Sequence, residues 1–316
     1  MSSGFDPAPA FTHEPVLLRE SLEALAIKPD GLYVDATLGA GGHAAHIAQR
    51  LTTGRLFGID RDPEALRRAV QTLAPFEGRV VLLHGDYRNL DSLLPDGTRP
   101  DGVLFDLGVS SPQFDDPARG FSYRYDTRLD MRMNPNDPIS AYEVVNQWPP
   151  EELRRILWAY GEEEYAPLIA AALIRRRAEA PIETTGQLAE LVTRALPPKA
   201  RRRKGHPAKQ CFQALRMAVN DELAGIREGL RAAIGLLKPG GRLAAISFHS
   251  VEDRAVKTTL AEAARGCTCP PDFPVCVCGK TPLIALVTRK PLTAAPAELE
   301  QNRRAHSAKL RVAEKI

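Results

Sequence analysis

The sequence lacks any stretch that is long and apolar enough to cross a membrane. No run among the 316 residues approaches the ~18 consecutive apolar side chains of a membrane-spanning helix. The first residues, which include Asp6, Pro7 and Pro9, also lack the basic and then apolar profile of a secretion signal. The net charge is only +3, which is too small to indicate a class of partner by itself. Because 44% of the residues are hydrophobic, we expect a globular protein with a sizeable core. The missing apolar stretch and secretion signal lead us to expect a cytoplasmic protein with no membrane association.

Cysteine is scarce, and its five residues exclude a disulfide-rich scaffold in a chain of this size. Four of them lie close together, at Cys267, Cys269, Cys276 and Cys278. Their C-x-C…C-x-C spacing differs from the C-x₂-C spacing that is typical of zinc ribbons. We interpret them as reduced loop cysteines or as a regulatory disulfide and predict no metal site. Zinc binding by the four thiolates is the alternative that the spacing leaves open.

Short apolar runs recur along the chain, with helical patterns between several of them. The runs of strand character are residues 32–36, 56–59, 80–83, 103–105 and 243–248, and a late run at 283–287 can add an edge strand. The alternation of strands and helices predicts an α/β fold with a mostly parallel, doubly wound, Rossmann-like sheet and helices on both faces.

The fourth and fifth runs are separated by about 135 residues, far more than a single crossover helix needs. Helical patterns at 153–160, 168–173 and 188–195 fill much of this interval. We therefore predict an inserted all-helical domain over residues 115–207, within a discontinuous domain formed by residues 1–114 and 208–316. A further pattern from 212 to 237 predicts one long helix that returns the chain to the sheet and ends at Pro239-Gly240-Gly241.

A glycine-rich turn follows the first run. The segment Val34-Asp35-Ala36-Thr37-Leu38-Gly39-Ala40-Gly41-Gly42, followed by His43, lies between a strand and a helical pattern. Glycines allow a sharp turn and the close approach of a ligand, and the helix N-terminus offers free N–H groups. Asp60 ends the second run about 20 residues later, where a doubly wound fold places a carboxylate on ribose hydroxyls. The motif predicts an adenosine cofactor and fits both a dinucleotide and S-adenosylmethionine.

Polar residues also follow the third and fourth runs. Tyr87 comes after the third, where an aromatic ring can stack on an adenine or close over it. Asp106 ends the fourth run, which neighbours the first strand in such a sheet, so its carboxylate is expected where substrate meets cofactor.

Basic residues gather locally near position 200. Six of them lie among prolines and a glycine, which favours a basic loop over a helix face: Lys199, Arg201, Arg202, Arg203, Lys204 and Lys209. Contact with nucleic-acid phosphates is the functional interpretation, and a solvated charge run is the alternative. His249, just past the fifth run, is a further candidate for RNA contact, with a helix-capping network as its alternative. Phe114, Phe121 and Tyr123 can line the entrance for an unstacked base or belong to the helical core.

These motifs together resemble the MraW family of bacterial S-adenosylmethionine-dependent methyltransferases, which modify the N4 amino group of a cytidine in the decoding region of 16S ribosomal RNA. The resemblance extends from residue 13 to about 311 and rests on the turn quoted above and on the segments His13–Leu18, Phe105–Gln113, Arg119–Ser122, Leu129–Met133, Tyr160–Glu163, His206–Ala208, Phe212–Arg216 and Ile246–Arg254. It implies a methyltransferase sheet with a helical insert and a partner that is 16S ribosomal RNA or the small ribosomal subunit. For S-adenosyl-L-methionine it implies contacts from Gly41, Gly42, His43, Asp60, Tyr87, Asp106 and Gln113.

The residue that activates the amino group is expected to be Asp106, acting with a neighbouring carbonyl. Many amino-methyltransferases use a D/N-P-P-Y sequence here, whereas this chain has Asp106-Leu107-Gly108-Val109. In the alternative, Asp106 serves the cofactor and another residue serves the base. Two further functions are left open by the motifs alone: a noncatalytic RNA-binding assembly factor and an NAD-dependent dehydrogenase. The sequence also leaves open whether the protein forms a homodimer.

Overall fold

The computed structural model describes residues 15–202, 205–267, 269, 275 and 277–316. The chain divides into two compact units, a first one formed by Met1–Gly108 with Ala224–Ile316 and a second one formed by Val109–Leu223. Eight residues of the sequence and segments named above lie outside the described residues: Asp6, Pro7, Pro9, His13, Glu14, Arg203, Lys204 and Cys276.

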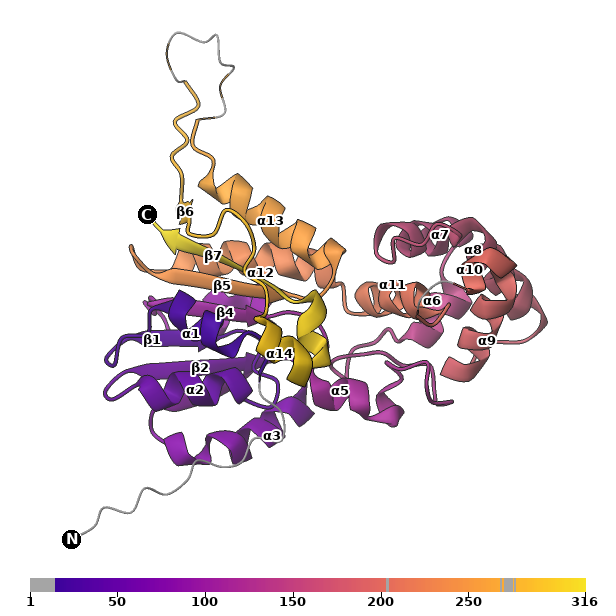
Figure 1. The fold of residues 1–316 in the computed structure, drawn as a ribbon, viewed down its shortest axis with the longest axis horizontal. Coiled ribbons are helices and arrows are strands. Elements are labelled where there is room, and N and C mark those ends of the chain that lie inside the picture. Colours follow the sequence, from indigo (N-terminus) through magenta and orange to yellow (C-terminus); the bar gives the residue numbers. More distant parts are fainter. Residues whose placement is uncertain (1–14, 203–204, 268, 270–274, 276) are drawn as a thin grey trace. The chain divides into compact units, whose positions relative to one another are not determined.

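The first unit is built on a 7-stranded sheet with the order β3-β2-β1-β4-β5-β7-β6 (Figure 1). Its strands are β1 (Leu32–Asp35), β2 (Arg55–Asp60), β3 (Val80–His84), β4 (Gly102–Asp106), β5 (Arg242–Ser247), β6 (Ile284–Leu286) and β7 (Lys309–Lys315). Neighbouring strands from β3 through β5 pair in parallel, and β7 pairs antiparallel with both β5 and β6. The predicted doubly wound α/β class is confirmed. The strand β7 was not predicted, because polar side chains alternate with its apolar ones near the end of the chain.

Helices of the first unit pack on this sheet through apolar faces. They are α1 (Leu18–Leu25), α2 (Gly42–Arg50), α3 (Pro63–Leu73), α4 (Leu90–Leu93), most of α12 (Glu222–Leu236), α13 (Ser250–Ala264) and α14 (Pro296–Gln301), with the short 3₁₀ turns η1 (Ala74–Phe76), η2 (Tyr87–Asn89) and η4 (Arg303–Ser307). Leu22 and Leu25 of α1 and Ile47 of α2 are buried in one cluster with Leu104 of β4 and Ile246 of β5. Among the described residues, no helix is long and apolar enough to cross a membrane.

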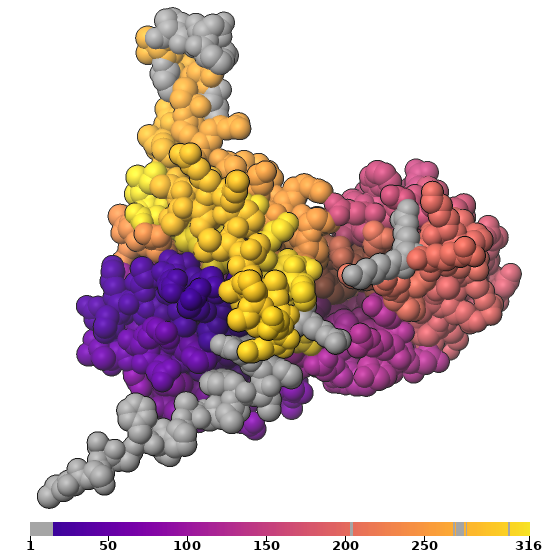
Figure 2. All heavy atoms as spheres, in the orientation of Figure 1, coloured from indigo at the N-terminus to yellow at the C-terminus, as the bar shows by residue number. Residues whose placement is uncertain are grey.

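The described residues between α13 and β6 extend away from the sheet (Figures 1 and 2). This part of the chain contains the three described cysteines of the cluster found in the sequence.

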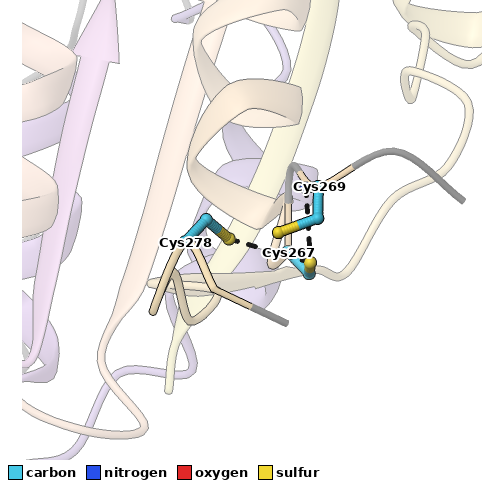
Figure 3. A group of neighbouring side chains, drawn as sticks. All are labelled: Cys267, Cys269 and Cys278. Atoms are coloured by element: carbon cyan, nitrogen blue, oxygen red, sulfur yellow. Dashed lines mark hydrogen bonds between the residues drawn. The ribbon is translucent and has the colours of Figure 1, made fainter. Parts of the chain in front are cut away.

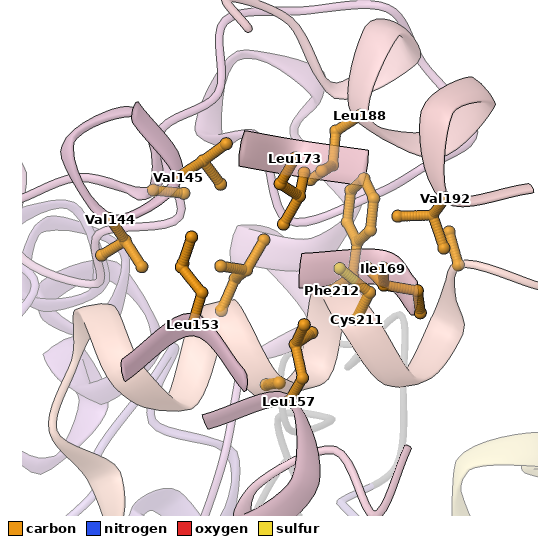
Figure 4. Close-up of a cluster of buried hydrophobic side chains, with 14 of the residues drawn as sticks. Val144, Val145, Leu153, Leu157, Ile169, Leu173, Leu188, Val192, Cys211 and Phe212 are labelled. Atoms are coloured by element: carbon orange, nitrogen blue, oxygen red, sulfur yellow. The ribbon is translucent and has the colours of Figure 1, made fainter. Parts of the chain in front are cut away.

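The second unit is helical and has its own core (Figure 4). Its elements are α5 (Ser111–Asp115), η3 (Pro117–Arg119), α6 (Ala141–Gln147), α7 (Pro150–Ala159), α8 (Ala166–Glu179), α9 (Thr185–Ala195), α10 (Pro198–Arg201) and α11 (Lys209–Val219). The boundaries differ from the predicted 115–207, because Cys211 and Phe212 of α11 are buried in the helical core. This burial assigns α11 to the helical unit and not to the sheet.

The single long helix predicted from 212 to 237 is wrong. The chain leaves the helix at Asn220 and turns at Asp221, whose φ of 47° is left-handed, before α12 begins. The side-chain amide of Asn220 donates to the carbonyl of Met131 and its oxygen accepts from the amide of Met133, both at 2.8 Å. The apolar periodicity continues across this break, which is why the sequence pattern alone did not reveal it.

Candidate functional site

The turn between β1 and α2 requires glycine where the sequence has it. Gly39 and Gly41 have φ values of 53° and 86°, in the left-handed region that favours glycine. A Cβ atom on Gly42 would lie 2.9 Å from Cγ of Pro15, so a side chain there would force the turn to move. The first turn of α2 presents backbone amides that have no partner within the helix, which suits a polar or anionic part of a ligand.

Asp60, at the end of β2, is tied to this turn by hydrogen bonds. Its Oδ2 accepts from the amide of Gly39 at 2.7 Å, and its Oδ1 accepts from the amide of Asp62 at 2.8 Å. Burial raises the pKa of Asp60 to about 6, although the two backbone hydrogen bonds counteract the effect. Each carboxylate oxygen can accept a second hydrogen bond, so Asp60 can hold the turn and also bind a ribose hydroxyl.

Asp106 ends β4, which lies next to β1 where the order of parallel strands reverses and where doubly wound folds bind their ligands. Its amide donates to Oγ1 of Thr37 at 2.5 Å, which fixes the strand end against the glycine turn. Its Oδ1 is buried and accepts no hydrogen bond from the described part of the chain. Burial raises the pKa of Asp106 to about 8, and the negative charges of Asp35 and Glu252 add to the effect.

His43 lies beside Asp106, with 3.6 Å between its Nδ1 and Oδ2 of Asp106. On the other side of the ring, Nε2 lies 3.1 Å from the carbonyl oxygen of Val16. Because a carbonyl can only accept, we assign the proton of the neutral ring to Nε2. Burial lowers the pKa of His43 to about 4, so the ring is neutral at pH 7. Its Nδ1 therefore faces the Asp106 carboxyl group as an acceptor.

Asp35, at the end of β1, is a site residue that the sequence analysis quoted in the turn but did not select. It is buried, its Oδ1 accepts from the amide of Thr37 at 3.2 Å, and burial raises its pKa to about 7. The signal was the one used for Asp106, a carboxylate that ends an apolar strand. Asp35, Asp60 and Asp106 thus place three carboxyl groups with raised pKa at one sheet edge. The unpartnered Oδ1 of Asp106 and these acidic groups fit a ligand with a ribose and a positive charge, as S-adenosylmethionine has.

Tyr87 starts the η2 turn, and its ring packs edge-on against Phe105 of β4, with 5.6 Å between the ring centroids. Gly229 of α12 makes room for this ring, because a Cβ atom there would lie 2.5 Å from Cδ2 of Tyr87. Tyr87 is therefore held against the sheet, and its contact with an adenine stays a prediction.

Gln113 belongs to the second unit. Its Oε1 accepts from the amide of Ser110 at 3.0 Å, which completes the capping box of α5. The structure describes the two units separately, so the contact between Gln113 and a cofactor also stays a prediction.

His249 caps α13, as the alternative interpretation expected. Its Nδ1 accepts from the amide of Glu252 at 3.3 Å, and its Nε2 lies 2.8 Å from Oε1 of the buried Glu252. The Glu252 carboxylate also accepts from the amide of Phe248 at 2.8 Å. His249 therefore has a clear local role, and its contact with RNA stays a prediction.

The basic cluster of the second unit is not the continuous loop that was predicted. Pro198–Arg201 form the helix α10, in which Pro198 occupies the first turn, where proline is favoured. Lys209 begins the next helix, α11. The guanidinium of Arg201 donates to the carbonyls of Leu196 at 2.7 Å and Arg194 at 3.1 Å. Arg202 and Lys209 are exposed, so their charges are accessible to a phosphate.

The aromatic residues considered for the entrance pack in the helical unit. Phe121 is buried in its core, and Phe114 and Tyr123 pack against that core. Tyr123 also stacks on His206, with 4.2 Å between ring centroids. The positions of these three side chains match the alternative interpretation, in which they belong to the helical core.

The raised pKa of Asp106 predicts a pH-dependent effect of Asp106→Asn on stability. Its folded pKa of about 8 lies above the usual 3.8, so the wild-type fold loses stability as the pH rises from 4 to above 8, while asparagine does not titrate. We expect equal stabilities at pH 4 and an advantage for the variant on the order of 1–2 kcal/mol at pH 8.5, a discounted figure because 29% of the side chain is exposed. Urea unfolding of both proteins at the two pH values measures this difference, and a pH-independent difference would contradict the assignment.

The sheet order, the glycine turn and the carboxylates at the strand reversal define an α/β protein that binds an adenosine-containing cofactor. The family model described as the MraW methylase family matches residues 10–316, and the chain belongs to this family. It is a methyltransferase that uses S-adenosyl-L-methionine. This result excludes the dehydrogenase that the glycine motif alone had left open.

Similar proteins cover nearly the whole chain. A ribosomal RNA small subunit methyltransferase H from Symbiobacterium thermophilum is 53% identical over 311 residues, which are 97% of this chain and 98% of that protein. One from Heliobacterium modesticaldum is 51% identical over 310 residues, 97% of this chain and 99% of that protein. A solved rRNA methylase from Streptococcus thermophilus is more distant, with 12% identity, a TM-score of 0.43, and coverage of 97% of this chain and 99% of that one.

Proposed function

We propose that this protein transfers a methyl group from S-adenosyl-L-methionine to the N4 amino group of a cytidine in the decoding region of 16S ribosomal RNA. The relatives that share about half of its residues are named ribosomal RNA small subunit methyltransferase H, which supports a substrate in the small-subunit ribosomal RNA. The choice of an amino group as the methyl acceptor rests on Oδ1 of Asp106. This oxygen is a buried hydrogen-bond acceptor that receives no hydrogen bond from the described residues.

An exocyclic amino group of cytosine is a poor nucleophile, because its lone pair is delocalised into the ring. A hydrogen-bond acceptor on one N–H bond helps to return that lone pair to the nitrogen. Asp106 offers such an acceptor at the strand reversal, and its pKa of about 8 suits a group that takes up a proton near neutral pH. S-Adenosyl-L-methionine, when bound, would supply an electrophilic methyl group, whose bond to sulfur breaks to leave the neutral thioether S-adenosylhomocysteine. Asp106 would accept the amino proton as the nitrogen gains the methyl group.

The neighbours of Asp106 hold it for this task. The Thr37 hydroxyl oxygen accepts from the backbone amide of Asp106 and fixes the end of β4. His43 remains neutral and therefore does not neutralise the carboxylate as a cation would. Gly41, Gly42 and Asp60 would hold the cofactor from the two adjacent strand ends. Positioning of both reactants then supplies a large part of the rate acceleration.

The product identity tests this proposal. Small ribosomal subunits that lack the modification are incubated with the protein and labelled S-adenosylmethionine, and the RNA is digested to nucleosides for mass spectrometry. We expect label in N4-methylcytidine from a decoding-region fragment. Label in a 5-methyl or 2′-O-methyl nucleoside would contradict the choice of the amino group, and normal subunit binding with no transfer would favour the noncatalytic assembly factor. Running free 16S RNA in parallel identifies whether RNA or the subunit is the substrate.

Exposed cations of the second unit should contribute to RNA binding through phosphates. We expect the double variant Arg202→Ala/Lys209→Ala to flatten the slope of log affinity against log salt by about 1.5, because each phosphate contact contributes about 0.7–0.9. Filter binding of a decoding-region RNA fragment across a salt series measures the slope. Arg154→Ala, an exposed arginine on α7 of the same unit, is the matched control. A slope that is the same in all three proteins would mean that the cluster is a solvated charge run.

A further inference from the structure

Three cysteine side chains converge in the segment between α13 and β6 (Figure 3). The sulfur atoms of Cys267, Cys269 and Cys278 all lie within 4.8 Å of one another. Cys267 is exposed, and Cys269 and Cys278 are partly buried. Cys267 and Cys269 follow the end of α13 and Cys278 precedes β6, so the cluster brings together described residues from both ends of this segment (Figure 3).

The spacing of the sulfur atoms distinguishes two kinds of cross-link. The Sγ atoms of Cys267 and Cys278 are 3.7 Å apart, whereas a disulfide bond is about 2.05 Å long. Two thiolates on one tetrahedral zinc ion, each at about 2.3 Å, are separated by about 3.8 Å. The observed separation excludes a disulfide bond and matches two ligands on one metal ion, and it is also the length of a hydrogen bond from the Cys278 thiol to Sγ of Cys267.

Backbone amides fix the positions of two of the sulfur atoms. The amide of Cys269 donates to Sγ of Cys267, and the amide of Val277 donates to Sγ of Cys269, both at 3.4 Å. Such bonds orient the ligands of a metal site.

The described apolar side chains beside the cysteines contribute little packing. Val275 and Val277 are 69% and 74% exposed, so these two residues add no buried apolar surface to the cluster. Ordering a chain without a core costs conformational entropy that burial does not offset. Small structural elements in this situation are commonly held by a metal ion or by disulfides.

We propose that Cys267, Cys269 and Cys278 bind one zinc ion, which fastens the chain between α13 and β6. Thiolates select soft or borderline metals, and zinc takes them in tetrahedral geometry. The three described sulfur atoms provide three of the four ligands. The sulfur separation excludes the disulfide between Cys267 and Cys278, and the convergence of three sulfur atoms within 4.8 Å of one another is the observation on which we choose zinc over reduced cysteines.

The metal content of the full-length protein, purified without a histidine tag or chelator, tests this proposal. Elemental mass spectrometry should find one zinc per chain, and Cys267→Ser, Cys269→Ser and Cys278→Ser should each lower the content at least fivefold. Cys211→Ala is the matched control: Cys211 is buried in the helical unit and burial raises its pKa, so this variant should keep its zinc. Cobalt exchanged into the wild type should give the visible spectrum of a tetrahedral thiolate site.

A second measurement reports on the cross-link itself. Removal of zinc by a chelator should speed proteolysis between residues 265 and 283 at least fivefold in the wild type, and the three serine variants should be cleaved fast without chelator. Three results would overturn the proposal: a disulfide between these cysteines in metal-free protein prepared without oxygen, iron with inorganic sulfide in place of zinc, or zinc that persists in all three serine variants.

Discussion

Asp106→Asn should lower kcat for methyl transfer by about 10²–10³-fold, with S-adenosylmethionine affinity changed less than tenfold. Asparagine keeps the size of the side chain and an oxygen that can accept a hydrogen bond. It cannot take up the amino proton, and its amide group can place a donor where the buried Oδ1 of Asp106 offers an acceptor. The loss is therefore expected in the chemical step. Single-turnover transfer to unmethylated subunits, together with calorimetric titration of the cofactor, separates the two quantities.

Two comparisons make the result specific to this carboxylate. Asp96→Asn removes an exposed carboxylate of the same unit and should leave both quantities unchanged. In the wild type, the single-turnover rate should rise with pH up to about 8, because Asp106 must be ionised to accept a proton. Asp106→Asn should lose this dependence. Full-rate transfer with normal cofactor binding would eliminate the catalytic role, and a loss confined to cofactor affinity would mean that Asp106 serves the cofactor.

The local structure that the sequence predicted well at the candidate site is encoded by short segments. A strand, a glycine turn and a helix specify their own local geometry, and Gly39 and Gly41 have the positive φ that the turn requires. Asp60 was placed by the regular spacing of a doubly wound fold, and its hydrogen bond to the Gly39 amide connects the two predicted features.

The features that escaped prediction depend on residues that are distant in the sequence. The unpartnered oxygen of Asp106 lies at the end of β4, whose pairing with the distant strand β1 no single segment encodes. The break between α11 and α12 depends on Asn220, which binds the backbone of Met131 and Met133 about 90 residues earlier. The spacing rules for metal ligands likewise describe ligands that are close together in the sequence. They gave no information on how Cys267 and Cys278, which are 11 residues apart, approach each other in space.

Arg311→Met should destabilise the first unit by about 3 kcal/mol at pH 7, because it leaves a buried carboxylate with too few partners. Arg311 of β7 and Asp253 of α13 are both buried, and the guanidinium donates to the two carboxylate oxygens at 2.7 and 3.1 Å. Lys309 lies 3.3 Å from the same carboxylate but is 38% exposed, so it compensates only in part. Urea unfolding followed by far-UV circular dichroism measures the change, since both tryptophans, Trp148 and Trp158, lie in the second unit.

The comparison variants separate the cost of an unpaired charge from the value of the pair. The double variant Asp253→Leu/Arg311→Met removes both charges, and its free energy of unfolding should lie within about 1 kcal/mol of the wild-type value. Arg242→Met breaks the more exposed pair with Glu314 between β5 and β7 and should cost at most about 1 kcal/mol. If Arg311→Met costs no more than Arg242→Met, the buried pair does not stabilise β7.

The pH dependence of Arg311→Met gives an independent check on the same ion pair. Burial opposes ionisation of Asp253, but the hydrogen bonds and charge of Arg311, with those of Lys309, outweigh it and hold the pKa of Asp253 below its usual 3.8. A carboxyl group whose pKa is lower in the folded protein than in the unfolded chain stabilises the fold at pH values above the unfolded pKa. This stabilisation disappears as the pH falls through the pKa of the folded protein. The difference between wild type and Arg311→Met should therefore be constant from pH 5 to 7 and shrink below about pH 4. A difference that persists unchanged at pH 3 would assign the loss to packing of the Arg311 side chain, since the charge of Asp253 is then largely absent.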